Sequence, residues 1–280
     1  MAKKFILVLI FILSTNSNFA FSFNSFNNDE KAIKKVLYSQ VKYANKENFN
    51  KFIKTFDNNY VNADGFNLDT YSALIKDIWK NFDKIVYSIE IKDIKINGNK
   101  AQVELLETSN AYIEMSRAYP GELKSSARTI YYLTKKNNDW KVSSDKVIDE
   151  TTSMLYGDAK NLKIKLDVPI EIDANKEYCA SLEFEPPSKT IAIASISSDI
   201  IEYPQGPTEE VFRALPEDNI LERLFTSNNK NANEYVIASI GLTQTSMDDL
   251  NLKLNLTGFG YYIRRINVIP FSNGEKNVEN

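Results

Sequence analysis

The stretch Tyr87-Ser-Ile-Glu-Ile-Lys-Asp-Ile-Lys-Ile-Asn-Gly98 marks the point where this 280-residue chain changes from a helical to a strand pattern. Apolar and polar side chains alternate along it, which is typical of a half-buried strand. The closing pair Asn97-Gly98 favours a two-residue hairpin turn. Alternation resumes beyond the turn at Ala101, Val103 and Leu105. The stretch therefore predicts an antiparallel hairpin.

The chain before this hairpin has helical spacing instead. Apolar side chains recur three or four residues apart in three segments, which predicts helices over 28–44, 49–56 and 70–85. A second hairpin is predicted downstream over 128–147, with its turn at 136–139. Three helices followed by antiparallel strands predict an α+β domain with the helices on one face of a curved sheet.

Four features of this half carry a resemblance to a known family. They are the helices, the loop Tyr60-Val-Asn-Ala-Asp-Gly65, the Asn97-Gly98 hairpin and the hairpin Leu133-Thr-Lys-Lys-Asn-Asn-Asp-Trp-Lys-Val142. Residues 27–152 thereby resemble the nuclear transport factor 2-like superfamily of cystatin-like folds, which includes SnoaL-like proteins and ketosteroid isomerases. The resemblance implies a cone-shaped domain with a pocket between sheet and helices. Because unrelated enzymes and pure binding proteins share this fold, it does not imply an activity.

The second half has strand patterns throughout. Short alternating runs punctuated by turns predict an all-β, sandwich-like domain over 160–271, loosely similar to bacterial immunoglobulin-like domains. Residues 149–159 are interpreted as a linker or short helix, and 208–215 and 219–225 as helical or irregular. The hydrophilic tail 272–280 is expected to be disordered.

The N-terminus has the pattern of a secretory signal peptide over residues 1–22. Lys3 and Lys4 precede an uncharged apolar run at 5–13 that is too short to span a bilayer. Cleavage is expected after Ser22, with Ala20 as the alternative, and an uncleaved anchor is the competing interpretation. No cysteine follows the apolar run, so a lipobox is excluded. We expect a bacterial protein, periplasmic or extracellular, with no stable membrane span after cleavage.

Composition excludes several chemistries. The chain has no histidine, which excludes histidine-dependent hydrolysis and histidine-based zinc sites. Its one cysteine, Cys179, cannot form an intramolecular disulfide and is expected to be a buried, small apolar side chain. A formal net charge of −3 argues against a nucleic-acid partner. No phosphate loop, dinucleotide fingerprint or metal-binding motif is present, so no cofactor and no metal are expected.

Candidate site residues follow from the expected pocket. The aromatic side chains expected to bind a ligand are Tyr60, Tyr71, Trp79, Tyr112 and Tyr131. A mechanism of the ketosteroid isomerase kind needs a carboxylate base and a tyrosine in an apolar cavity, for which Asp64 with Tyr60 or Tyr112 are the candidates. The same residues also have ordinary structural explanations, because tyrosine favours strands and Asp64 precedes Gly65 in a turn.

Three functions are consistent with this pattern. The first is an exported, non-catalytic protein that binds a small molecule, a peptide or a protein partner. The second is an isomerase or lyase with a carboxylate base and a tyrosine in the pocket. The third is a component of cell-envelope assembly. A carboxylate of raised pKa facing a tyrosine hydroxyl inside an apolar cavity would separate the first two.

Overall fold

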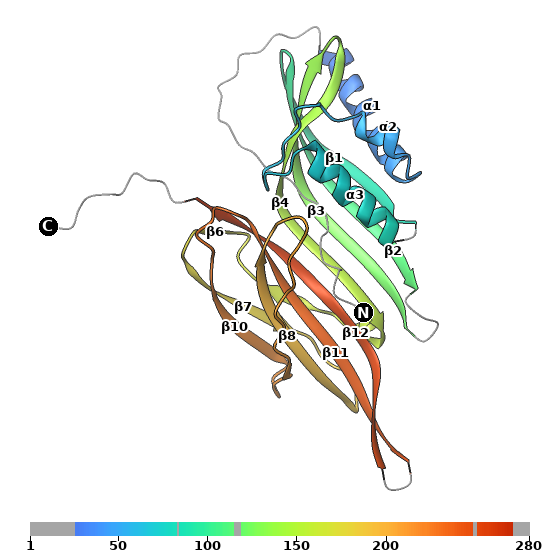
Figure 1. Cartoon of the computed structure of the whole chain (residues 1–280), viewed down its shortest axis with the longest axis vertical. Coiled ribbons are helices and arrows are strands. Elements are labelled where there is room, and N and C mark those ends of the chain that lie inside the picture. Colours follow the sequence, from blue (N-terminus) through green and yellow to red (C-terminus); the bar gives the residue numbers. More distant parts are fainter. Residues whose placement is uncertain (1–25, 83, 115–118, 249–250, 271–280) are drawn as a thin grey trace, which may run out of the picture. The chain divides into compact units, whose positions relative to one another are not determined.

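The computed structural model describes residues 26–82, 84–114, 119–248 and 251–270 (Figure 1). The chain divides into two compact units. The first holds Met1–Met154 and the short segment Glu202–Pro207, and the second holds Leu155–Ile201 and Thr208–Asn280. The signal peptide expected at 1–22 and the tail at 272–280 lie outside the described residues. The domain bounds 27–152 and 160–271 stay predictions.

The helices of the first unit are α1 (Phe26–Ala44), α2 (Phe49–Ile53) and α3 (Leu68–Asn81). Side chains cap two of them: Asn48 accepts from the Lys51 backbone N–H and Asn67 from that of Thr70. Helix α3 ends four residues before the expected Ile85, because the next residue, Phe82, has extended backbone.

The sheet of the first unit contains β1 (Val86–Asn97), β2 (Lys100–Glu114), β3 (Pro120–Lys136) and β4 (Asp139–Gly157). The hairpin predicted at Asn97-Gly98 is confirmed, since Asn97 pairs with Lys100 and Gly98 has a φ of 55°. The predicted turn before Asp139 is also confirmed. Asn137 and Asn138 both have positive φ there, as a primed turn requires.

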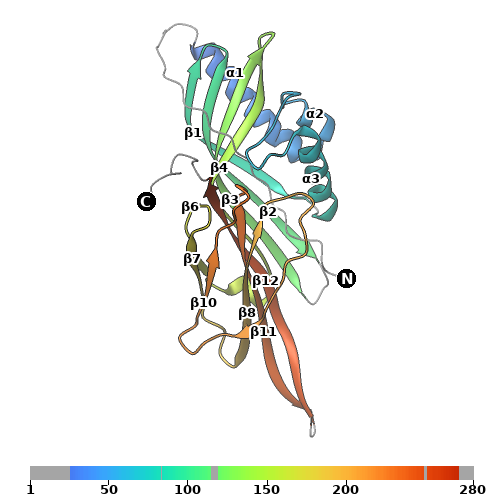
Figure 2. The ribbon, with the colours of Figure 1, turned by 60° about the vertical axis from the view of Figure 1, so that its left-hand side comes forward.

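The helices cover one face of this sheet (Figures 1 and 2). Ile33 and Leu37 of α1 and Leu74, Ile75 and Ile78 of α3 are buried, as their helical spacing predicts. The facing side chains of the strands are buried as well and include Val103, Leu105, Leu133 and Val142. The core of the first unit therefore lies between the helices and the sheet.

In its described residues, the second unit contains a short 3-10 helix and eight strands. The helix η1 spans Asp158–Asn161. The strands are β5 (Lys165–Asp167), β6 (Glu171–Asp173), β7 (Glu177–Glu183), β8 (Thr190–Ile200), β9 (Arg213–Ala214), β10 (Ile220–Thr226), β11 (Glu234–Asp248) and β12 (Asn251–Ile269). Strands β10, β7 and β5 form a three-stranded sheet of their own. Its side chains share one core with β8, β11 and β12, in which Leu182, Phe184, Val236 and Leu242 are at most 2% exposed.

The expected fold class, an α+β cone with three helices followed by a separate β-sandwich, is wrong. The structure is mostly antiparallel sheet, 55% strand and 17% helix. One nine-stranded sheet has the order β1-β2-β3-β4-β12-β11-β8-β9, and β6 pairs with β12 in parallel. The sequence pattern missed this because two strands are much longer than the apolar runs indicate: β4 has 19 residues and β11 has 15.

The stretch 149–159, interpreted as a linker or short helix, belongs mainly to β4. Glu150 and Thr152 are buried there, so polar side chains occupy inward positions and interrupt the apolar alternation. Near the end of the strand, Tyr156 stacks on Phe259 of β12 with 4.6 Å between ring centroids. Because these buried residues are polar, the second half of β4 has no apolar alternation by which it could be predicted as a strand.

Two further expectations for the second half are wrong. Residues 219–225, expected to be helical or irregular, form most of strand β10, in which Leu221 pairs with Leu182 of β7. Residues 208–212 are irregular, which is one of the two expected alternatives, and Arg213–Ala214 form the short strand β9. Cys179 is exposed. It lies in β7 between the buried Tyr178 and Ala180, and alternation along the strand turns its side chain to the opposite face.

Candidate functional site

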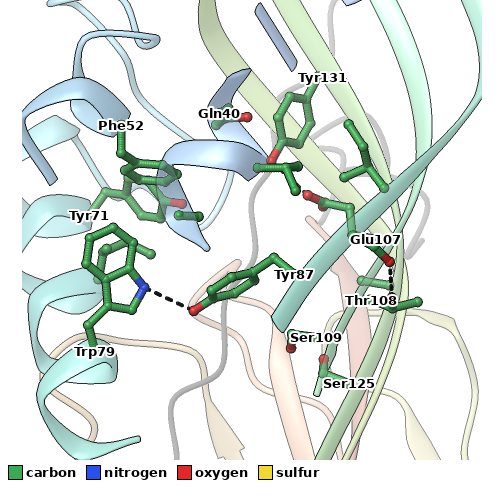
Figure 3. A pocket seen from close by; sticks show the side chains of 16 residues that line it. Gln40, Phe52, Tyr71, Trp79, Tyr87, Glu107, Thr108, Ser109, Ser125 and Tyr131 are labelled. Carbon is green, nitrogen blue, oxygen red and sulfur yellow. Dashed lines mark hydrogen bonds between the residues drawn. The ribbon is translucent and has the colours of Figure 1, made fainter. Parts of the chain in front are cut away.

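The first unit contains a cavity of about 80 Å³ between its helices and its sheet. Six elements contribute to its wall: α1, α2 and α3 on one side, and β1, β2 and β3 on the other. Figure 3 shows the aromatic side chains of α2 and α3 opposite the strand residues. The cavity is lined by Gln40, Val41, Ala44, Phe52, Tyr71, Ile75, Trp79, Tyr87, Ser88, Ile89, Glu107, Thr108, Ser109, Ser125, Ala127 and Tyr131.

Aromatic rings form the helical side of the cavity. Phe52 lies 5.5 Å from Trp79 and 6.3 Å from Tyr71 between ring centroids. The Trp79 indole N–H donates to the Tyr87 hydroxyl over 3.1 Å, which connects α3 to β1 (Figure 3). Burial raises the pKa of Tyr87 to about 12, so its hydroxyl keeps its proton at neutral pH. The aromatic part of the cavity wall is therefore uncharged.

Glu107 of β2 supplies a carboxyl group to the strand side. The Tyr131 hydroxyl of β3 donates to Glu107 Oε1 over 2.9 Å. Burial raises the pKa of Glu107 from its ordinary value of 4.5, while the hydroxyls of Thr129 and Tyr131 act in the opposite direction. Burial also raises the pKa of Tyr131, and the charge of Glu107 adds to that effect. A proton donor and a proton acceptor thus face each other at the cavity.

A second carboxylate, Asp145 of β4, lies behind the same tyrosines. It is fully buried, and its Oδ2 accepts a hydrogen bond from the Tyr60 hydroxyl over 3.2 Å. Burial raises the pKa values of Tyr60, Tyr71 and Tyr131, and the negative charge of Asp145 adds to the shift in each. Two acidic groups therefore act on one cluster of neutral tyrosines.

Smaller polar groups line the rest of the strand side. The hydroxyls of Ser88 and Thr108 are 2.7 Å apart and hydrogen-bonded across β1 and β2. Ser109 and Ser125 lie on the neighbouring strands β2 and β3 (Figure 3). Among the described residues that line the cavity, Glu107 is the one acidic side chain and none is basic.

The structure brings some of the predicted site residues together. Tyr71, Trp79 and Tyr131 line the cavity. Tyr60 is buried beside them but contributes no lining surface, and it contacts Tyr71 with 5.7 Å between ring centroids. Tyr71 and Trp79 belong to α3 and Tyr60 to the loop before it, whereas Tyr131 comes from β3, about 50 residues further along the chain.

The other two predicted residues lie elsewhere. Tyr112 is 60% exposed on β2 and does not line the cavity. Asp64 is half-buried in the turn before Gly65, and it does not line the cavity either. The acidic residue at the cavity is Glu107, which the sequence analysis did not single out. Glu107 lies two residues beyond Leu105 on β2, and side chains two residues apart on a strand lie on the same face. This spacing is the sequence signal that could have identified Glu107.

None of the helices in the described part of the chain is long and apolar enough to cross a membrane. Within the same residues, no cluster of three or more histidine, cysteine, aspartate or glutamate side chains could hold a metal ion.

Comparison with known proteins finds partial likenesses in structure. No protein-family model matches the sequence, and no curated protein matches it. Bd1075 of Bdellovibrio bacteriovorus is 13% identical with a TM-score of 0.38, and the match covers 45% of this chain and 42% of that one. A Nostoc punctiforme protein of unknown function with a cystatin-like fold is 15% identical (TM-score 0.35), and the Kfla4162 protein of Kribbella flavida is 12% identical (TM-score 0.37). Each of these two matches covers 43% of this chain and 90% of the other. None of the three covers half of this chain, and the likeness expected for the C-terminal half stays a prediction.

Proposed function

We propose that this protein binds a small molecule in the cavity of its first unit. The observation that carries the proposal is the composition of the cavity wall. Rigid aromatic rings lie on the helical side, and a few hydrogen-bonding groups, led by Glu107 and Tyr131, lie on the strand side. Ligand sites in proteins typically combine such an apolar lining with a small number of placed polar groups.

Export remains part of this proposal. The basic residues Lys3 and Lys4, the short apolar run at 5–13 and the small residues before position 23 support it. N-terminal sequencing of the protein from a producing cell would test it, with Phe23 as the expected first residue. An intact Met1 in all of the protein would contradict cleavage.

Mass spectrometry of the protein under native conditions tests the binding function. The protein purified from a producing cell is expected to release one small molecule upon denaturation. In the variant Ala127→Leu, a larger side chain enters the cavity from β3, and the molecule should be absent. Ala101→Leu is the matched control, because Ala101 is equally buried but does not line the cavity. Equal amounts of ligand in both variants, or none in the unchanged protein, would refute the proposal.

Acid–base catalysis is a second candidate, and one observation favours it. Glu107 has a raised pKa and accepts a hydrogen bond from Tyr131 inside an apolar cavity. A carboxylate of raised pKa is a stronger base near neutral pH, and neighbouring hydroxyl groups can stabilise the negative charge of an enolate. In this proposal Glu107 takes the place of Asp64 as the base and moves a proton between two carbon atoms of a ketone.

The isomerisation of 3-cyclohexenone to 2-cyclohexenone tests this second candidate by ultraviolet absorbance. Glu107 would remove a proton from the carbon between carbonyl and double bond and return it to the far end of the double bond. Glu107→Gln should abolish the reaction. Glu104→Gln should retain it, since Glu104 lies on the same strand and contacts Arg128 instead of the cavity. Equal rates in the two variants would exclude Glu107 as the base.

A further inference from the structure

We infer that the ligand class of the cavity is a small organic amine in its cationic form, with its ammonium group beside Glu107 and its apolar body against Phe52, Tyr71 and Trp79. This inference rests on the proposed binding function and specifies the chemistry of the ligand. It follows from the balance of charge around the cavity, from the aromatic rings and from the volume.

The side chains around the cavity carry negative charge, and no basic side chain is among the described residues of its wall. Glu107 is the acidic group among the described lining residues, none of which is basic. Asp145 adds a second negative charge behind Tyr60, Tyr71 and Tyr131. A buried carboxylate without a cationic neighbour is costly to ionise, and an incoming cation offsets that cost. The Tyr131 hydroxyl donates a hydrogen bond to Glu107 and favours its ionised form further.

The aromatic rings provide the second half of a cation site. Phe52, Tyr71, Trp79 and Tyr87 line the same cavity as Glu107. The faces of such rings carry partial negative charge and attract ammonium groups, and the interaction strengthens when the site excludes water. Aromatic groups that surround an ammonium ion are a recurring arrangement for amine ligands. The apolar part of the ligand gains burial against the same rings.

The volume limits the size of the ligand. A cavity of about 80 Å³ holds several water molecules or a compact organic group, because one water needs roughly 10–15 Å³ by the same kind of measure. A single ring with one short substituent is therefore a suitable size. A neutral molecule would leave Glu107 without charge compensation, and a carboxylate ligand would repel it.

Calorimetric titration with three probes of similar size tests the inference. The probes are benzylammonium, benzyl alcohol and benzoate, which differ in charge at the group that would meet Glu107. We expect benzylammonium to bind at least tenfold more tightly than benzyl alcohol and benzoate not to bind. Glu107→Gln should remove the preference for the cation, and Glu104→Gln should keep it.

Proton release provides a readout that needs no variant. Binding of the cation favours the ionised form of Glu107, so at a pH near the raised pKa of this group the complex should release a proton. Titrations in buffers of different ionisation enthalpy measure that release. For the probe titrations that use Glu107→Gln, thermal melting of this variant first establishes that it folds.

The outcomes separate the two levels of the proposal. If benzyl alcohol binds as tightly as benzylammonium and Ala127→Leu blocks both, the cavity binds ligands but the cationic class is wrong. If benzoate binds most tightly, the cationic class is wrong as well. If none of the three binds at millimolar concentration, the cationic class is overturned, while a ligand released from the purified protein would still support binding of another kind.

Discussion

The Tyr131 hydroxyl and the Glu107 carboxyl, 2.9 Å apart on adjacent strands, form the polar centre of an otherwise aromatic cavity. They belong to β3 and β2, which are antiparallel neighbours. Their side chains meet on the face of the sheet that the helices cover. The protonation of Glu107 in this pair affects both the stability of the first unit and the chemistry proposed for the cavity.

Glu107→Gln should become more stable relative to the unchanged protein as pH rises. Burial raises the pKa of Glu107 above its ordinary 4.5, so the folded state holds this proton more tightly than the unfolded state does. Protonated Glu107 therefore stabilises the folded state fully below pH 4.5, and this stabilisation is lost as the pH rises through the raised pKa. The loss amounts to about 1.4 kcal/mol for each unit by which the folded pKa exceeds the unfolded one. Melting temperatures at pH 4 and pH 8 measure it. Glu104→Gln, on the same strand but away from the cavity, is the control, and a parallel response of the two variants would contradict the prediction.

Asp29→Asn should destabilise the first unit by about 1–2 kcal/mol at neutral pH. Asp29 Oδ1 accepts from Lys135 Nζ at 2.6 Å and from Trp140 Nε1 at 3.0 Å, so one carboxylate connects the start of α1 to β3 and β4. The hydrogen bond from Lys135 lowers the pKa of Asp29 below its ordinary 3.8 despite an opposing effect of burial, and Trp140 adds to the lowering. The loss should therefore be present above pH 3.8 and shrink as pH falls through the lowered value.

Chemical denaturation of Asp29→Asn at pH 7 and pH 3 measures this effect. Glu30→Gln is the matched control on the same helix, because its partner Lys34 is an exposed neighbour one turn away. Such pairs contribute a few tenths of a kcal/mol or less. A Glu30 effect as large as that of Asp29 would show that charge on α1, rather than the buried contacts, is responsible.

Ala127→Leu should leave the melting temperature unchanged or raise it, because its added atoms can enter the cavity. Ala101→Leu should lower stability by roughly 1–3 kcal/mol, the usual cost of overpacking a filled core. Both alanines are 6% exposed, which makes them a matched pair. Calorimetric melting of the two variants decides. If both destabilise equally, the cavity is not available to a side chain.

Gly258→Ala should be among the most damaging single-atom additions in the second unit. A Cβ at Gly258 would lie 2.5 Å from the Ala159 backbone nitrogen and 2.9 Å from that of Asp158, and backbone atoms cannot move aside cheaply. We expect a loss of about 3 kcal/mol or more. Gly206→Ala is the control, since its Cβ would meet its first neighbour at 3.5 Å. Denaturation midpoints of both variants test the difference, and equal midpoints would refute it.

Cys179 should react with a thiol reagent in the folded protein. Its side chain is exposed on β7, between two buried neighbours. Labelling by 5,5′-dithiobis(2-nitrobenzoate) without denaturant should reach one thiol per chain. Addition of denaturant should not increase the final extent, and Cys179→Ser should abolish the reaction. A thiol that reacts after unfolding alone would contradict the exposed placement.

Periodicity predicted the local structure of the first half well. The helical spacing of Ile33 and Leu37, the alternation after Tyr87 and the Asn97-Gly98 turn all depend on neighbours within a few residues. These features are readable from sequence because backbone geometry and side-chain spacing determine them locally. The same reasoning failed in β4, where the inward Glu150 and Thr152 depend on partners that sequence does not reveal.

The candidate site was predictable in part for the same reason. Tyr71, Trp79 and Tyr131 were named as aromatic side chains of the expected pocket, and they do line the cavity. Asp64 was selected by its place in a loop and Tyr112 by its residue type, and neither criterion depends on burial. Glu107 was missed, although its spacing from Leu105 places it on the inward face, because glutamate side chains are rarely buried and the residue type by itself argues against an inward position.

The sequence by itself determined the helices, the two hairpin turns and the absence of histidine chemistry. Those follow from residue spacing, turn preferences and composition. Tertiary structure alone decided that the strands continue into one nine-stranded sheet, that Cys179 faces outward, and that Glu107 meets Tyr131 at a cavity. Strand pairing and burial join residues far apart in the chain, and their free energy depends on packing that no local pattern records.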